Sequence, residues 1–187
     1  MSKNKTKLTK NTTIIPIDNI NDIPDEVKIL ASEHYEPRIL EKLLGCSKTH
    51  DYCSGVCEEV CINKKFHLIT NRQFGEINAF ALIHTEWDID RKNFGWIDFV
   101  MVKRENRSDG LGSSLTELAI GLLQEKNVAN ISTTILFPIG VEGESGYPNY
   151  GSTEQLLTWG FKPLAQNRYR YIPIADYKYK QEIYVLH

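Results

Sequence analysis

A glycine-containing turn, 107-RSDGLG-112, holds the residues whose types and spacing could do chemistry. It lies between an apolar run at 95–102 and an amphipathic run at 113–126. The first N–H groups of a helix have no partner inside it, and the helix dipole adds partial positive charge there. Glycine lets the backbone approach an anion closely, and Arg107 can add a charge-assisted contact. The turn therefore predicts a site for a phosphate-bearing cofactor.

The elements that must position this turn follow from hydrophobic periodicity and turn residues. Helical spacing of Leu115, Leu118, Ala119 and Leu122 predicts a helix over 113–126. Other expected helices cover 24–34, 38–44 and 152–158, the last ending at Gly160. Expected strands cover 14–17, 66–70, 77–87, 95–102, 131–137, 161–164, 169–174 and 182–186. A turn is expected at 71–75 and a polar loop at 88–93, whereas 46–63 is ambiguous.

This pattern, without repeat or linker, predicts one α+β domain over 13–187 with a mixed, mostly antiparallel central sheet flanked by helices. Residues 1–12 are polar and basic, and we expect a disordered tail. The sequence has no apolar run near 18 residues and no secretory h-region, so we expect a cytoplasmic protein without membrane contact.

The net charge of −2 is unevenly distributed. The first ten residues hold four lysines and no acid, so the remainder has 18 basic and 24 acidic residues, a formal charge of −6. Such a body does not attract nucleic acid nonspecifically, and we expect no nucleic-acid partner. It mildly favours cationic substrates, although a solvated acidic surface is the simpler interpretation.

The segment 96-WIDFVMVKRENRSDGLGSSLTELA-119 resembles the acetyl-CoA-binding core of the GNAT N-acetyltransferase superfamily. The family signature Arg/Gln-x-x-Gly-x-Gly/Ala, between the fourth strand and third helix, is matched by Arg107, Gly110 and Gly112. Downstream, 149-NYGSTEQLLTWGF-161 is similar to the family's Asn-x-x-small-x7-Gly-Phe pattern. A dinucleotide-binding site is disfavoured because the third glycine is missing.

The resemblance implies an N-acetyltransferase that uses acetyl-CoA as cosubstrate, bound in a cleft where the fourth and fifth strands splay apart. Its pyrophosphate would meet the turn and its pantetheine arm would pair with the edge of the fourth strand. The Val102 N–H would polarise the thioester carbonyl. The implied cofactor-binding residues are Val100, Val102, Arg107, Asp109, Gly110, Gly112, Ser113, Ser114 and Asn149.

The implied reaction is direct attack of a primary amine, on a small molecule or a protein, on the thioester. Only about 0.04% of a lysine-like amine is neutral at pH 7, so a general base is useful, whereas an α-amino group needs less help. Asp98 and Glu86 are the candidate bases, with His84 as a third option. Each could instead be a solvent-facing strand or rim residue.

The chain departs from the family pattern at Leu156, where many members carry a tyrosine that protonates the leaving thiolate. Tyr150 is the candidate acid in its place, with Tyr147 as an alternative, although both could simply pack in a loop. The glycine-rich loop at 138–151 could be a substrate lid or a surface loop.

All four cysteines lie in a short stretch, at Cys46, Cys53, Cys57 and Cys61. The last three share a helical face, and His50 and His67 are close in sequence. The paired Cys-x2–4-Cys knuckles of zinc sites are absent, so we assign no metal and favour a buried apolar face. A redox-sensitive thiol stays open.

Three alternatives to the acetyltransferase stay open. A catalytically inactive acyl-CoA-binding or sensing module is favoured by Leu156. An interaction protein without an active cofactor site is the second. The third is an acetyltransferase acting on charged tRNA, which the acidic body disfavours. The acceptor's identity, the acyl chain length and a homodimeric state are left open.

Overall fold

The computed structural model describes residues 11–33, 40, 44, 64–87, 92–138, 150–164 and 179–187. Outside these residues lie most of the expected helix at 38–44, the cysteine region, the loop at 139–149, the expected strand at 169–174 and residues 1–10 of the expected tail. Thr12, expected in the disordered tail, instead begins the first strand and pairs with Asn71. Within the described part, no helix is long and apolar enough to cross a membrane.

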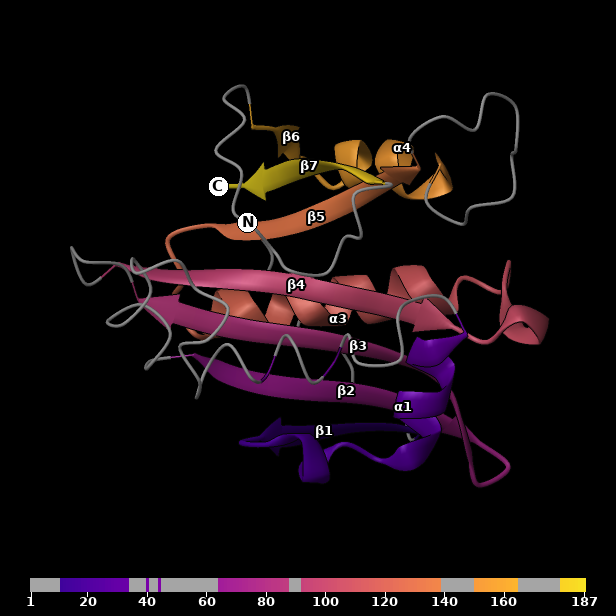
Figure 1. The fold of residues 1–187 in the computed structure, drawn as a ribbon. Helices are drawn as coiled ribbons and strands as arrows, with labels where there is room; N and C mark the ends of the chain where they lie inside the picture. The colour runs from indigo at the N-terminus through magenta and orange to yellow at the C-terminus, as the bar shows by residue number, and fades with distance from the viewer. Residues whose placement is uncertain are drawn as a thin grey trace.

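The described elements are strands, α-helices and short 3-10 helices (Figure 1). The strands are β1 (Thr12–Ile17), β2 (Lys65–Gln73), β3 (Glu76–Trp87), β4 (Asn93–Val102), β5 (Ile131–Pro138), β6 (Lys162–Pro163) and β7 (Tyr179–Leu186). The α-helices are α1 (Asp25–Ser32), α3 (Leu111–Glu125) and α4 (Tyr150–Thr158), and the short 3-10 helices are η1 (Ile20–Asp22) and η4 (Arg104–Asn106).

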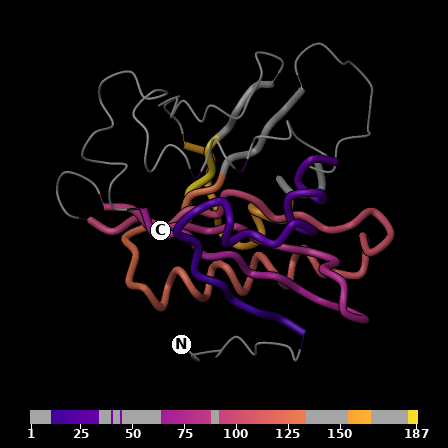
Figure 2. Tube along the Cα trace, turned by 60° about the horizontal axis from the view of Figure 1, so that its bottom comes forward, coloured from indigo at the N-terminus to yellow at the C-terminus, as the bar shows by residue number. Residues whose placement is uncertain are grey.

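These strands form one mixed sheet in the order β1-β2-β3-β4-β5-β7-β6. All the pairs are antiparallel except β4 with β5, which is parallel. The connection between those two strands is α3, which follows β4 after a turn and runs back along the sheet (Figure 2). The α+β fold class is therefore confirmed.

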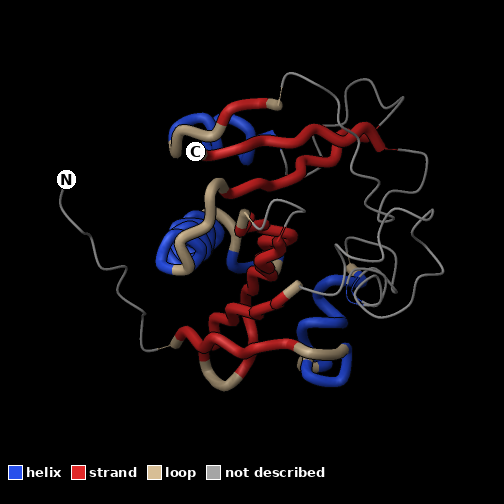
Figure 3. The backbone as a smooth tube through the Cα atoms, turned by 90° about the vertical axis from the view of Figure 1, so that its left-hand side faces the viewer, coloured by secondary structure: helices blue, strands red, loops and turns tan. Residues whose placement is uncertain are grey.

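Helices cover both faces of the sheet, with α3 and α4 on one side and α1 on the other (Figure 3). The α1-side core includes Val27, Leu30, Phe66, Phe80, Leu82, Phe99 and Met101. The α3-side core includes Ile69, Ala81, Ile83, Ile97, Leu115, Leu118, Ala119, Leu123, Leu156 and Phe161. Because both faces are covered, β3 is buried from Ile77 to Glu86 without the alternation of a half-exposed strand.

Three sequence-based details need correction. The expected turn at 71–75 is only two residues long, because Asn71 to Gln73 continue β2 and pair with β3. Residue 93, expected in a loop, is the first residue of β4. On α3, Leu123 is fully buried, whereas Leu122, expected on the buried face, is only partly covered. Each correction reflects packing against a neighbouring element, which local composition does not report.

Two glycines, Gly95 and Gly160, occupy positions where a side chain would disturb the packing or the backbone conformation. A Cβ on Gly95 would lie 3.0 Å from a methyl carbon of Leu123, so a larger residue there would have to displace that side chain of α3 by a few tenths of an ångström. Gly160 has φ +88° and ends α4, as predicted. The Phe161 N–H donates to the Leu156 carbonyl and the Gly160 N–H to the Leu157 carbonyl, which is the Schellman arrangement. This turn leads the chain from α4 into β6.

Candidate active site

The predicted anion-binding turn begins α3. Gly110 is the residue before the helix and has a left-handed backbone with φ +74°, as does Ser108 with φ +73°. The first hydrogen bond of the helix runs from the Ser114 N–H to the Gly110 carbonyl at 3.0 Å. The N–H groups of Leu111, Gly112 and Ser113 therefore precede the helical ladder and share its positive end. This geometry suits a phosphate group.

A fork between β4 and β5 opens beside this turn. The two strands pair in parallel only at Gly95–Ile131, Trp96–Ser132 and Ile97–Thr133. Beyond those pairs β4 continues to Val102 and β5 to Pro138, and their ribbons diverge (Figure 1). The Thr133 hydroxyl donates to the Ile97 carbonyl at 3.0 Å. Where the pairing of β4 with β5 ends, this carbonyl therefore accepts from a side chain.

A β-bulge at Asp98 determines which backbone groups of β4 face the fork. Ile97 is opposite Ile83 and Phe99 is opposite Leu82, so Asp98 is the extra residue. The Lys103 N–H donates to the Asn78 carbonyl at 2.8 Å, so Lys103 faces β3. By the alternation of an antiparallel ladder, the backbone groups of Val100 and Val102 face away from β3, towards the fork.

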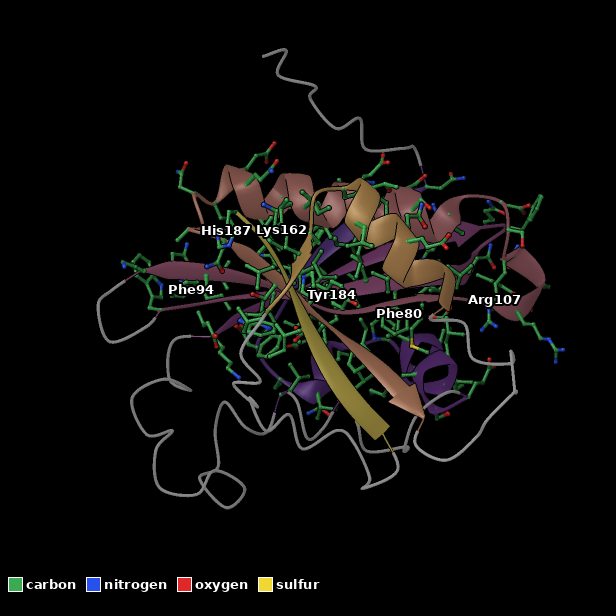
Figure 4. The ribbon with its side chains drawn as sticks, turned by 90° about the horizontal axis from the view of Figure 1, so that it is seen from above. Phe80, Phe94, Arg107, Lys162, Tyr184 and His187 are labelled. Atoms are coloured by element: carbon green, nitrogen blue, oxygen red, sulfur yellow. The ribbon has the colours of Figure 1, made fainter. Side chains whose placement is uncertain are left out.

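Arg107 connects the turn to the end of β4. Its Nε donates to the Val102 carbonyl at 3.2 Å, so part of the guanidinium holds the strand end in place. Gly112 also approaches this residue, since a Cβ there would lie 3.4 Å from Cγ2 of Val102. Figure 4 shows Arg107 beyond the end of the sheet opposite to Phe94, the second residue of β4. The turn and the last residues of β4 therefore form one unit.

A buried cluster of polar side chains lies on the α1 side of the fork. His84 Nδ1 is 2.6 Å from Asp98 Oδ2, and its Nε2 is 3.6 Å from Glu86 Oε2. The Trp96 indole N–H donates to Glu86 Oε1 at 2.9 Å. The His84 ring also packs against Phe66 and stacks on Trp96. The structure thus brings together all three candidate bases.

The environment of His84 sets its proton affinity. Burial disfavours the charged ring, but the Asp98 carboxylate outweighs this through its charge and hydrogen bond, and Glu86 adds to it. Lys64 acts in the opposite direction, and the net result is a pKa of His84 above its usual value. The ring therefore holds a proton more readily than an imidazole in water.

The expectation of exposed rim positions is wrong for Glu86 and His84. His84 is only 3% exposed and Glu86 is also buried, because β3 is covered on both faces. The Asp98 side chain is likewise nearly enclosed, with 6% of it exposed, instead of facing solvent. Three ionisable groups have thus been brought out of water together, an arrangement more typical of functional sites than of ordinary strands.

The α4 helix contacts the turn through one polar pair, in which Gln155 Nε2 donates to Ser113 Oγ. Leu156, at the family's tyrosine position, is 6% exposed and belongs to the α3-side core. Tyr150 is the first residue of α4, and its side chain lies outside what the structure describes. Asn149 and Tyr147 are outside the described residues as well.

Sequence reasoning missed Thr133, Trp96 and Gln155. Thr133 matters because it lies where two strands stop pairing, and that position depends on register, which leaves no local signal. Trp96 could have been proposed as a partner for Glu86 only with the β3–β4 pairing known. Among the described residues, no group of three His, Cys, Asp or Glu side chains is arranged to hold a metal ion.

Comparisons with known proteins identify the fold. No protein-family model matches the chain, and no curated protein matches it by sequence. A proposed acetyltransferase of the GNAT family from Desulfovibrio desulfuricans superposes with a TM-score of 0.55 at 12% identity, covering 94% of this chain and 98% of that one. The ribosomal-protein-S18-alanine N-acetyltransferase from Escherichia coli gives 0.54 at 16% identity, covering 94% and 92%.

A third match is Naa50 from Arabidopsis thaliana in complex with the bisubstrate analogue CoA-Ac-MVNAL. Its TM-score is 0.54 at 12% identity, and the match covers 95% of this chain and 99% of that one. The protein therefore has the α+β fold of the GNAT acetyltransferases, and the resemblance seen in the sequence is confirmed at the level of the fold.

Proposed function

We propose that the protein is an acetyl-CoA-dependent N-acetyltransferase, which transfers an acetyl group to a primary amine on a small molecule or a protein. The observation that carries this proposal is a juxtaposition along β4. The start of α3, with three N–H groups ahead of its hydrogen-bond ladder, lies at the open end of the fork between β4 and β5, and the last β4–β5 pair closes the other end. A phosphate followed by a long peptide-like arm fits this path.

The backbone supports a direction for the cosubstrate. The pyrophosphate would meet the N–H groups around Gly110, Gly112 and Ser113, with Asp109, Ser114 and Arg107 beside them. The arm would then pair with Val102 and Val100, whose backbone groups face the fork. From Val102 to Asp98 an extended chain runs about 13 Å, so the end of the arm would lie near the bulge.

This direction bears on the predicted role of the Val102 N–H. Val102 packs against Gly112 and therefore lies close to the phosphate end of the path. The thioester, at the opposite end of the arm, would lie nearer to Asp98 than to Val102. We therefore propose that Val102 pairs with the arm, and that the backbone beside the bulge faces the thioester carbonyl, where an N–H would stabilise developing negative charge.

The polar cluster supplies the proton chemistry that an amine acceptor needs. Asp98 and Glu86 bring two carboxylates to the α1 side of the fork, and they could accept a proton directly or through water. Their negative charge also favours an acceptor that arrives as an ammonium ion. Tyr150 stays the candidate acid for the leaving thiolate. The reacting amine would thus enter from the face opposite α3.

A catalytically inactive acyl-CoA-binding or sensing module is the second candidate. The burial of Leu156 in the α3-side core favours it, because the chain places an apolar packing residue where the family has its acid. Binding of acetyl-CoA without turnover of any amine would support this alternative.

Calorimetric titration with acetyl-CoA tests the proposed function. We expect micromolar binding by the wild type and binding at least tenfold weaker in Gly110→Asp, because the new carboxylate repels phosphate and occupies the helix N–H groups. Gly110→Asn is the matched control, since both residues tolerate a left-handed backbone and a Cβ at this position meets no atom within 4 Å. Folded wild type that does not bind acetyl-CoA would refute the acetyltransferase and favour an interaction protein.

A further inference from the structure

One buried nitrogen in the polar cluster makes no hydrogen bond. His84 Nε2 is buried and makes no hydrogen bond, because Glu86 Oε2 is 3.6 Å away. The other ring nitrogen is fixed 2.6 Å from Asp98 Oδ2. A carboxylate can only accept, so Nδ1 carries the proton of the neutral ring and Nε2 presents a lone pair. Buried polar atoms in proteins nearly always have a partner, so this atom requires an explanation.

We propose, building on the function proposed above, that His84 Nε2 is the general base that takes the proton from the acceptor amine, and that Asp98 is its positioning residue. Nε2 first takes one proton from the arriving ammonium ion and releases it to solvent, which frees the amine to attack. As the nitrogen–carbon bond forms and the carbon–sulfur bond breaks, the amine nitrogen gives its second proton to Nε2. That proton then goes to the thiolate sulfur, directly or through water, so the imidazole returns to its neutral form. Acetyl-CoA and the amine are the only reactants.

Its basicity distinguishes His84 from the two carboxylates, each of which has one oxygen in a hydrogen bond. Asp98 Oδ2 is engaged by the ring, and Glu86 Oε1 is engaged by the Trp96 indole. Imidazole is also the stronger base of the two side-chain types, and an amine needs a base whose pKa approaches the working pH. The Asp–His pair with a free distal nitrogen is the arrangement by which proteins orient an imidazole for proton transfer.

The position of the ring agrees with this role. His84 pairs in register with Trp96, and Trp96 pairs with Ser132 on β5, one residue before the last β4–β5 pair. Asp98 is the bulged residue directly after that pair. The hydrogen bond therefore ties the ring to the closed end of the fork, where the pairing of β4 with β5 stops. Glu86 beside Nε2 stabilises the imidazolium formed in the reaction, and the Trp96 indole N–H keeps Glu86 in place.

The ring's charge state depends on groups from each neighbouring element. Asp98 on β4 and Glu86 on β3 favour the protonated ring, whereas burial and Lys64, which precedes β2, oppose it. The resulting pKa of His84 lies above its usual value, which brings a base of appropriate strength to the pH range where amines are mostly protonated.

The first test is kinetic, with CoA release measured on a panel of small primary amines and N-terminal peptides. We expect His84→Gln to lower kcat about 10²- to 10⁴-fold at pH 7, and the loss to shrink at high pH as the amine deprotonates unaided. Asp98→Asn should move the apparent pKa of the kcat/KM profile downward, which a purely structural role would not do. His67→Gln is the matched control, because this second histidine lies on β2 and contacts Lys126.

Calorimetry and NMR separate the two proposals. Acetyl-CoA binding should be unchanged in His84→Gln, so a wild type that does not bind it would overturn both proposals together. Retained binding with wild-type kcat and pH profile in His84→Gln would overturn only the assignment of the base. Nitrogen-15 NMR of the histidines needs no acceptor: we expect the neutral His84 ring to be protonated at Nδ1, and a proton at Nε2 would refute the proposal.

Discussion

Residues 93–97 and 98–102 belong to the same strand, β4, but only the first half has a partner on both sides. The first half pairs with β3 and β5, and Gly95 lets α3 pack against it. Among the described strands, the second half pairs only with β3, and it presents the backbone of Val100 and Val102 to the fork. The bulge at Asp98 separates them, so one irregular residue divides a structural half from a half that is available for binding.

This difference predicts that substitutions in the first half mainly change stability and that substitutions in the second half mainly change binding. Side chains of both halves reach the α3-side core, with Ile97 from the first half and Val100 and Val102 from the second. Packing therefore does not distinguish them. The difference lies in backbone hydrogen bonds, which are satisfied within the sheet in one half and are available to a peptide-like ligand in the other.

The largest expected effect comes from the paired half. Gly95→Val places a Cβ 3.0 to 3.3 Å from three carbons of Leu123 and should lower the free energy of unfolding by about 2–3 kcal/mol. Urea denaturation measures this loss. Leu123→Ala in the same chain should make the Gly95→Val change cost less, as a double-mutant cycle would show. A cost unaffected by residue 123 would mean that the helix contact does not explain the glycine.

The next effect lies at the border between the halves. Thr133→Val removes the hydroxyl that donates to the Ile97 carbonyl and should cost about 1–2 kcal/mol of stability. Acetyl-CoA affinity should fall too, because β5 is then free to pair further along β4 and narrow the fork. Thr133→Ser keeps the hydroxyl and serves as the control in both denaturation and calorimetry. Equal behaviour of the valine and serine variants would show that this hydrogen bond does not define the fork.

A smaller effect is expected at the far end of the unpaired half. Arg107→Ala removes the hydrogen bond to the Val102 carbonyl and should weaken acetyl-CoA binding about 2- to 10-fold. Arg107→Lys keeps the positive charge but loses the fixed planar fork of donors. If the lysine variant binds like the alanine variant, the contact with Val102 matters most. If it binds like the wild type, the charge near the phosphates is sufficient.

Much of this strand and its surroundings could be predicted from the sequence. Hydrophobic periodicity indicated α3, and Gly110 and Gly160 marked helix ends that have left-handed backbones, because such positions favour glycine. The turn as an anion site followed from local residue types. These features are local, since each depends on a few consecutive residues and on the conformations they tolerate.

The bulge and the buried cluster could not be predicted in the same way. Asp98 is an ordinary polar residue in its own strand, and its contact with His84 exists only because β3 and β4 pair with a one-residue shift. Register is a property of two strands, so one strand's composition does not reveal it. The apolar run at 79–83 was the available signal for a strand covered on both faces, and extending it along β3 would have placed His84 and Glu86 inside.

The smallest expected effect is the pH dependence of stability that comes from two histidines, His67 on β2 and His84 on β3. His67 lies near the paired half, where its Nε2 is 3.3 Å from Lys126 Nζ, and burial together with that charge lowers the pKa of His67. His84 is opposite Trp96 and hydrogen-bonds Asp98 at the boundary between the halves, and its pKa is raised because Asp98 and Glu86 together outweigh the effect of burial. The two rings should therefore give stability opposite pH dependences.

The signs follow from where each ring binds its proton. Stability contributed by His84 is present below pH of about 6.5 and is lost as pH rises through its raised folded-state pKa. For His67, stability is present above pH of about 6.5 and is lost as pH falls towards its lowered pKa. Urea denaturation across pH 5–9 should show His84→Gln removing the alkaline loss and His67→Gln removing the acid loss. If the free energy of unfolding changed with pH in the same way in both variants, the two histidines would not differ in electrostatic environment. The two halves of β4 would then differ only in their backbone pairing.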